Sequence, residues 1–149
     1  MIEIRRASVT SKEAVQLIEE LSSILENITG SSGNASFQAD ALKAARTIFV
    51  IAYSDGEPVG CGALQNYSND IAEIKRVYSK IKGVGIGTQI LWTLEEYAYS
   101  YGYRKIVLET RKINTTAVRF YQKSGYRICP NYGKYTHHEE AVCFYKSIV

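Results

Sequence analysis

The segment 71–110 constrains the fold of this chain more than any other part of the sequence. Residues 71–78 (IAEIKRVY) form a β-rich run, and a glycine-rich bend follows at 82–87 (KGVGIG). A helical pattern then repeats apolar residues at intervals of four. Residues 104–110 (RKIVLET) return to a strand with a central apolar run, which is typical of a strand covered on both faces. Strand, helix and strand in this order predict a βαβ unit with a right-handed crossover between parallel strands.

The first half of the chain shows a hairpin pattern instead. Residues 47–53 (TIFVIAY) and 58–64 (PVGCGAL) are β-rich runs on either side of an Asp-Gly turn, which is a strong signal for an antiparallel hairpin. Residues 1–9 begin with alternating apolar positions and predict a further strand. We expect these strands to join the βαβ unit in one mixed sheet.

Between the first strand and the hairpin, the sequence predicts two helices and a flexible connection. Thr10 or Ser11 can cap a helix, whose apolar stripe consists of Ala14, Leu17, Ile18, Leu21 and Leu25. Residues 27–36 (NITGSSGNAS) predict a flexible segment, because glycine and small polar residues dominate it. Residues 37–45 predict a short second helix.

The end of the chain predicts one more helix and two strands. Asn114 can cap a helix over 115–124, and Gly125 can end it. The two strands are expected at 126–129 and 141–148. Together the elements predict the α+β class: a single domain over residues 1–149, with antiparallel N-terminal strands, a C-terminal βαβ unit and helices on both faces of the mixed sheet.

Composition narrows the function classes. The chain has 149 residues, 46% of them hydrophobic, which suits one globular core. A net charge of +3 is short of the basic surface expected of a nucleic-acid binder. No apolar run approaches the roughly 20 residues that span a bilayer, and the N-terminus lacks a signal-peptide stretch. We therefore expect a cytoplasmic protein with no nucleic-acid or membrane partner. The three cysteines are too scattered to predict a metal site.

The glycine bend is the strongest functional signal. Gly83, Gly85 and Gly87 lie between a strand and a helix, where backbone N–H groups and the helix N-terminus favour phosphate oxygens. A P-loop is excluded because the chain contains no Gly-Lys-Ser/Thr. A dinucleotide fingerprint fits less well, because its third glycine position falls on Thr88.

The bend and the segments around it resemble the GNAT superfamily of acyl-CoA-dependent N-acetyltransferases. KGVGIG at 82–87 resembles the family's pyrophosphate-binding signature, and 72–78 looks like its central strand. Residues 114–126 (NTTAVRFYQKSGY) are similar to its N-x-x-A-x-x-F/L-Y-x-x-x-G-F/Y segment. The C-terminal segments resemble a bacterial branch of uncharacterised substrate. Two features depart from the family pattern: Lys82 replaces the usual Arg or Gln, and the preceding loop is short and lacks a proline.

The resemblance implies a GNAT-like domain that transfers an acetyl group from acetyl-CoA, its co-substrate, to a primary amine by direct attack in a ternary complex. Glu73 is then the candidate general base and Tyr121 the acid that protonates the departing sulfur. The cofactor is expected to contact Val77, Tyr78, Lys82, Gly83, Val84, Gly85, Ile86, Gly87, Thr88, Asn114, Ala117 and Tyr121. The acceptor is a small-molecule or peptide amine, and a homodimer is compatible with the family.

Several alternatives remain open at this stage. Glu109 or water alone can replace Glu73 as the base, and the same fold can serve as a non-catalytic acyl-CoA sensor. A cysteine acyl-enzyme is disfavoured, since no cysteine has an evident histidine partner in the sequence. Tyr132 and Tyr135 are candidates for the rim of the acceptor site.

Overall fold

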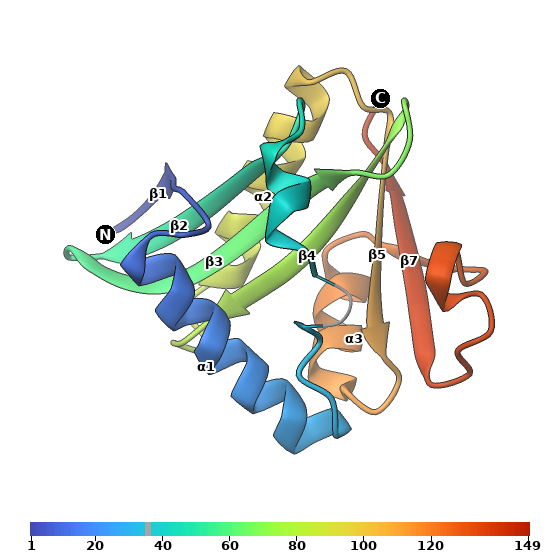
Figure 1. Ribbon diagram of the computed structural model, residues 1–149, viewed down its shortest axis with the longest axis horizontal. Helices are drawn as coiled ribbons and strands as arrows, with labels where there is room; N and C mark the ends of the chain where they lie inside the picture. Colours follow the sequence, from blue (N-terminus) through green and yellow to red (C-terminus); the bar gives the residue numbers. More distant parts are fainter. Residues whose placement is uncertain (35–36) are drawn as a thin grey trace.

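The computed structural model describes residues 1–34 and 37–149 and contains one mixed sheet (Figure 1). Within these residues the sheet has seven strands in the order β1-β2-β3-β4-β5-β7-β6. The strands are β1 (Ile2–Arg6), β2 (Ile48–Ser54), β3 (Glu57–Asn66), β4 (Ile71–Ser79), β5 (Lys105–Arg111), β6 (Arg127–Cys129) and β7 (Ala141–Ser147). The helices are α1 (Lys12–Thr29), α2 (Ile86–Ser100) and α3 (Thr115–Lys123), with 3-10 turns η2 (Ala39–Lys43) and η3 (Gly133–Tyr135).

The topology confirms the predicted α+β fold. Strands β1 to β4 pair antiparallel in sequence order, and β4 and β5 pair in parallel on either side of α2. Strand β7 lies between β5 and β6 and pairs antiparallel with both.

Helices cover both faces of the sheet, as predicted, and β2 shows this most clearly. Phe49 and Ile51 pack with residues of α1, whereas Val50 and Ala52 pack in the cluster that contains α2. Successive side chains of a strand point to opposite faces, so a strand buried on both faces has no polar alternation. In Figure 1, α1 lies in front of the sheet and α2 behind it.

The parallel strands β4 and β5 are paired over only a short segment and then diverge. Pairing covers only Ile71, Ala72 and Glu73 of β4, although this strand continues to Ser79. Strand β4 also carries a bulge: Ala63 of β3 faces Lys75, but Cys61 faces Tyr78. The extra residue in β4 twists it away from its neighbour. The sheet therefore opens between β4 and β5.

Two predicted boundaries are wrong. Helix α1 extends to Thr29 and ends where Gly30 adopts a left-handed conformation, so the predicted flexible segment 27–36 begins inside a helix. Residues 35–36 of that prediction lie outside the described residues. In place of the predicted helix 37–45, the structure has only the 3-10 turn η2. The Thr47 hydroxyl donates to the carbonyl groups of Leu42 and Ala44, which a longer helix would use for its own hydrogen bonds.

Candidate active site

The opening between β4 and β5 forms a cleft made of two adjoining cavities. The glycine-loop cavity, of about 470 Å³, extends from Lys82 and Thr88 to α1 and α3. The β5 cavity, of about 160 Å³, extends to Glu109, Thr110 and Arg111. Both cavities are lined by Leu21, Leu25, Val77, Asn114, Ala117 and Tyr121. The shared lining places both cavities in one continuous cleft.

An open helix N-terminus lies at one end of the cleft. Gly83 and Gly85 have φ angles of +80° and +79°, which few other residues adopt. Gly85 is the N-cap of α2, and neither a side-chain cap nor an acidic residue in the first turn competes for its free N–H groups. A Cβ atom at either glycine would meet nothing within 4 Å. Such an end of a helix binds anions through backbone N–H groups and the helix dipole.

Tyr121 lies where the two cavities meet. It comes from α3, whose N-terminus is fixed by the Asn114 side chain accepting a hydrogen bond from the Ala117 N–H at 3.3 Å. The Tyr121 ring packs against Tyr126 and Phe144. Burial raises the pKa of Tyr121, so the phenol stays protonated at neutral pH.

Glu109 of β5 is the carboxylate that lines the β5 cavity. Its Oε2 atom is buried and accepts no hydrogen bond from any of the described residues, although the Arg111 Nε atom lies 3.7 Å away. Burial raises the pKa of Glu109, while the charges of Arg111 and Lys75 act in the opposite direction. A carboxylate with a raised pKa in a small cavity is a suitable proton acceptor.

Glu73, the first candidate for the base, lies behind the cleft and lines neither cavity. Its side chain is buried rather than exposed on the strand. The Tyr132 hydroxyl donates to Oε2 at 2.6 Å, and Gln65 Nε2 donates to Oε1 at 3.1 Å. Lys75 Nζ lies 3.5 Å from Oε2. Both carboxylate oxygens are thus already engaged.

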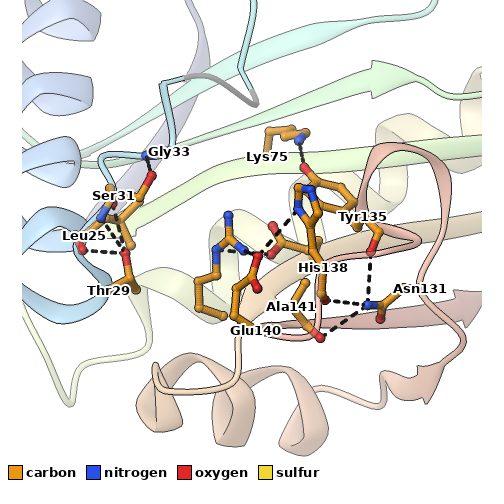
Figure 2. A network of polar contacts seen from close by, with 12 residues as sticks. Leu25, Thr29, Ser31, Gly33, Lys75, Asn131, Tyr135, His138, Glu140 and Ala141 are labelled. Atoms are coloured by element: carbon orange, nitrogen blue, oxygen red, sulfur yellow. Dashed lines mark hydrogen bonds and ion pairs between the residues drawn. The ribbon is translucent and has the colours of Figure 1, made fainter.

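Lys75 connects Glu73 to the loop before β7. Figure 2 shows its contact with Tyr135 of that loop. Its ammonium group donates to the Tyr135 hydroxyl, and burial lowers the pKa of Lys75 while Glu73 opposes this shift. Asn131 holds the loop by donating to the carbonyl groups of Tyr135 and His138 (Figure 2). Tyr135 is buried, and neither Tyr135 nor Tyr132 lines the cleft. The two tyrosines predicted for the rim of the acceptor site therefore do not contact either cavity.

Arg76 occupies the bulge of β4 and was not singled out from the sequence. Its backbone has a φ angle of +59°, and only 8% of the residue is exposed. The guanidinium group donates to the Ser32 carbonyl at 3.1 Å and to Asn34 Oδ1, and it lies over the Phe37 ring. Arg76 also lines the β5 cavity.

The structure brings most of the predicted cofactor residues together. Those that line the glycine-loop cavity are Val77, Tyr78, Lys82, Gly83, Gly85, Ile86, Gly87, Thr88, Asn114, Ala117 and Tyr121. Val84 does not line it and is 56% exposed. Sequence reasoning missed Ile24 and Ile28 of α1, which line the same cavity. The sequence signal that could have identified them is their spacing of four residues, next to the predicted apolar stripe of the helix.

No helix in the ranges 1–34 and 37–149 is long and apolar enough to cross a membrane. In the same part of the chain, no group of three or more His, Cys, Asp or Glu side chains has an arrangement that could hold a metal ion.

The mixed sheet, the glycine bend before α2 and the capped helix α3 define the fold of acyl-CoA-dependent N-acyltransferases. The chain belongs to the GNAT acetyltransferase family, whose family model matches residues 14–126. Acyl transfer is therefore the general chemistry of the group to which it belongs.

Individual relatives agree with this assignment. The chain is 29% identical over 137 residues to the IAA acetyltransferase of Azospirillum brasilense, covering 90% of each protein. A Klebsiella pneumoniae protein classed among the acyl-CoA N-acyltransferases has a TM-score of 0.85 and 25% identity, with 100% of this chain and 99% of that chain covered. A GNAT acetyltransferase of Elizabethkingia anophelis, solved with acetyl-CoA bound, has a TM-score of 0.72 and 20% identity over 98% and 97% of the two chains.

Proposed function

We propose that the protein transfers an acetyl group from acetyl-CoA to a primary amine by direct attack in a ternary complex. One observation carries the proposal: two cavities meet at Tyr121, one ending at the open N-terminus of α2 and the other at Glu109. This arrangement gives the acyl donor and the acceptor separate entrances to one reaction point.

The residues of the glycine-loop cavity suit coenzyme A. Backbone N–H groups at 83–87 would hold the pyrophosphate, and Lys82 would add a positive charge. Beyond Glu73, the edge of β4 that faces β5 has no strand partner within the part of the chain that the structure describes. Main-chain groups near Val77 and Tyr78 are thus available to bind the pantetheine arm and to polarise the thioester carbonyl.

Proton removal from the acceptor is assigned to a carboxylate. An alkylamine with a pKa of about 10.4 is mostly ammonium at neutral pH, so a proton acceptor is needed before attack. Glu109 lines the cavity and has a raised pKa, which favours it as the group that contacts the amine. Glu73 was the first candidate from the family resemblance. Glu73 is the alternative general base, although it lines neither cavity and forms an ion pair with Lys75.

Tyr121 is assigned to the departing sulfur. Its hydroxyl is protonated at neutral pH and belongs to a side chain that lines both cavities. The phenol would donate a hydrogen bond to the thiolate as the carbon–sulfur bond breaks, and the proton then passes to sulfur.

Thermal unfolding and thiol release test this function together. The melting temperature should rise with millimolar acetyl-CoA but not with NAD, because binding to the folded state alone stabilises it. Free coenzyme A should then appear only when an amine from a broad panel is added. A thermal shift without release by any amine would favour the alternative, an acyl-CoA sensor. No shift with acetyl-CoA would refute both functions.

A further inference from the structure

Within residues 1–34 and 37–149, Arg76 is a buried cation without an anionic partner. Among the described residues no carboxylate lies within 4 Å of its guanidinium group, which donates only to the neutral oxygens of Ser32 and Asn34. Its Nε atom is buried and has no hydrogen-bond partner in the same part of the chain. A buried charge of this kind is costly unless a partner neutralises it.

The other cations of the β5 cavity differ from Arg76 in this respect. Lys75 forms an ion pair with Glu73, and Arg111 forms ion pairs with Glu109 at 3.7 Å and Glu140 at 2.8 Å. Internal pairing therefore satisfies these two charges. It leaves Arg76 as the lining cation whose charge is available to a ligand.

We propose that the acceptor carries a carboxylate that binds Arg76, so that the substrate is an amino acid rather than a simple amine or a polyamine. The proposal rests on the function proposed above. Arg76 and Glu109 line the same cavity of about 160 Å³ and offer one positive and one negative group. An amino acid presents the complementary pair, a carboxylate and an ammonium group.

The charge of the cavity wall disfavours the competing acceptors. Lys75, Arg76 and Arg111 line it together with one carboxylate, Glu109. A polyamine would bring further positive charges to a wall on which the charge of Arg76 is already unneutralised, and like charges in a desolvated site repel strongly. A simple amine would leave the charge of Arg76 without a partner.

Matched acceptors test the proposal directly. The pairs are L-phenylalanine with phenethylamine, and L-methionine with 3-(methylthio)propylamine, each measured as kcat/KM for acetyl-CoA-dependent thiol release. The native protein should prefer the amino acid of each pair by at least about tenfold, the size expected for a hydrogen-bonded charge pair. A preference for the decarboxylated amines would overturn the proposal.

Variants of Arg76 separate carboxylate binding from support of the loop. Arg76→Gln should reduce the preference within each pair to about one, mainly by raising KM for the amino acid. Arg76→Lys should retain part of it, since the charge remains but the planar fork is lost. Arg127→Gln, on exposed β6 away from the cleft, is the matched control and should change nothing. If Arg76→Gln lowers the activity on both members of a pair equally, the residue only positions the loop and the proposal is wrong.

A binding experiment covers the case in which no amine is acetylated. Protein saturated with coenzyme A is titrated calorimetrically with N-acetyl-L-phenylalanine and with N-acetyl-L-phenylalaninamide. Binding of N-acetyl-L-phenylalanine but not of N-acetyl-L-phenylalaninamide would support the anion site even though catalysis had failed, provided that Arg76→Gln loses this binding. Equal binding, or none, by both probes would reject the site independently of the fate of the catalytic proposal.

Discussion

Leu21 and Tyr121 line the same two cavities, although their helices pack on opposite faces of the sheet. Leu21 belongs to the core cluster of α1, and Tyr121 belongs to the cluster that contains α2. They line one cleft because β4 and β5 stop pairing after Glu73. The cleft therefore passes through the sheet, and a side chain from the far face reaches the reaction point.

Tyr121→Phe should lower kcat about 100-fold while leaving the affinity for acetyl-CoA nearly unchanged. The substitution removes the proton donor but keeps the ring that packs on Tyr126 and Phe144. Steady-state thiol release and calorimetric binding of acetyl-CoA check the two expectations. Tyr99→Phe is the control, because Tyr99 is 66% exposed on α2. Undiminished turnover in Tyr121→Phe would exclude the acid role.

Glu109→Gln should remove the acid limb of the pH profile of kcat/KM. A general base acts as the carboxylate, so a raised pKa of Glu109 makes activity rise with pH at a higher pH than an ordinary glutamate would. Because burial disfavours the charged form, replacement by a neutral amide should not destabilise the fold at neutral pH. The profile of Glu73→Gln is the comparison. If Glu73→Gln removes the acid limb of the pH profile and Glu109→Gln does not, Glu73 is the base.

Gly85→Ala should weaken binding of acetyl-CoA by about tenfold without affecting binding of S-acetylpantetheine. A residue with a Cβ atom at a φ angle of +79° is strained, and relief of the strain would turn the first N–H groups of α2 away from the pyrophosphate. S-acetylpantetheine lacks this pyrophosphate and serves as the matched probe. Equal weakening for both ligands would show that the cleft as a whole had changed.

Gly60→Ala should lower the free energy of unfolding by about 2 kcal/mol, as overpacking of a core does. A Cβ atom there would lie 2.6 Å from the Tyr78 carbonyl oxygen and 2.9 Å from Ile90 Cδ1. Gly56→Ala is the comparison: its φ angle is +86° but the space around it is open, so strain alone should cost about 1 kcal/mol. Urea denaturation measures both. A loss for Gly60→Ala no greater than that for Gly56→Ala would contradict the expected clash.

Local patterns in the sequence were sufficient to predict the strands of the sheet and the glycine bend at one end of the cleft. The Asp-Gly turn, the apolar run of β2 and the glycine bend each depend on neighbouring residues and on simple periodicities. The same is true of Asn114, whose role as helix cap is confirmed. The family resemblance added the likeness of 82–87 to a pyrophosphate site, and all of these residues except Val84 line the cleft.

Only the tertiary structure decided which charged groups face the cleft. Glu73 and Glu109 each follow an apolar residue on a strand, so alternation could not show that Tyr132 and Gln65 engage one of them while the other lines the cavity. Arg76 gave no local signal either, since its isolation depends on the β4 bulge and on a loop more than 40 residues away in sequence. Periodicity reports the faces of an element, whereas strand separation, bulges and charge pairing arise from contacts between distant segments.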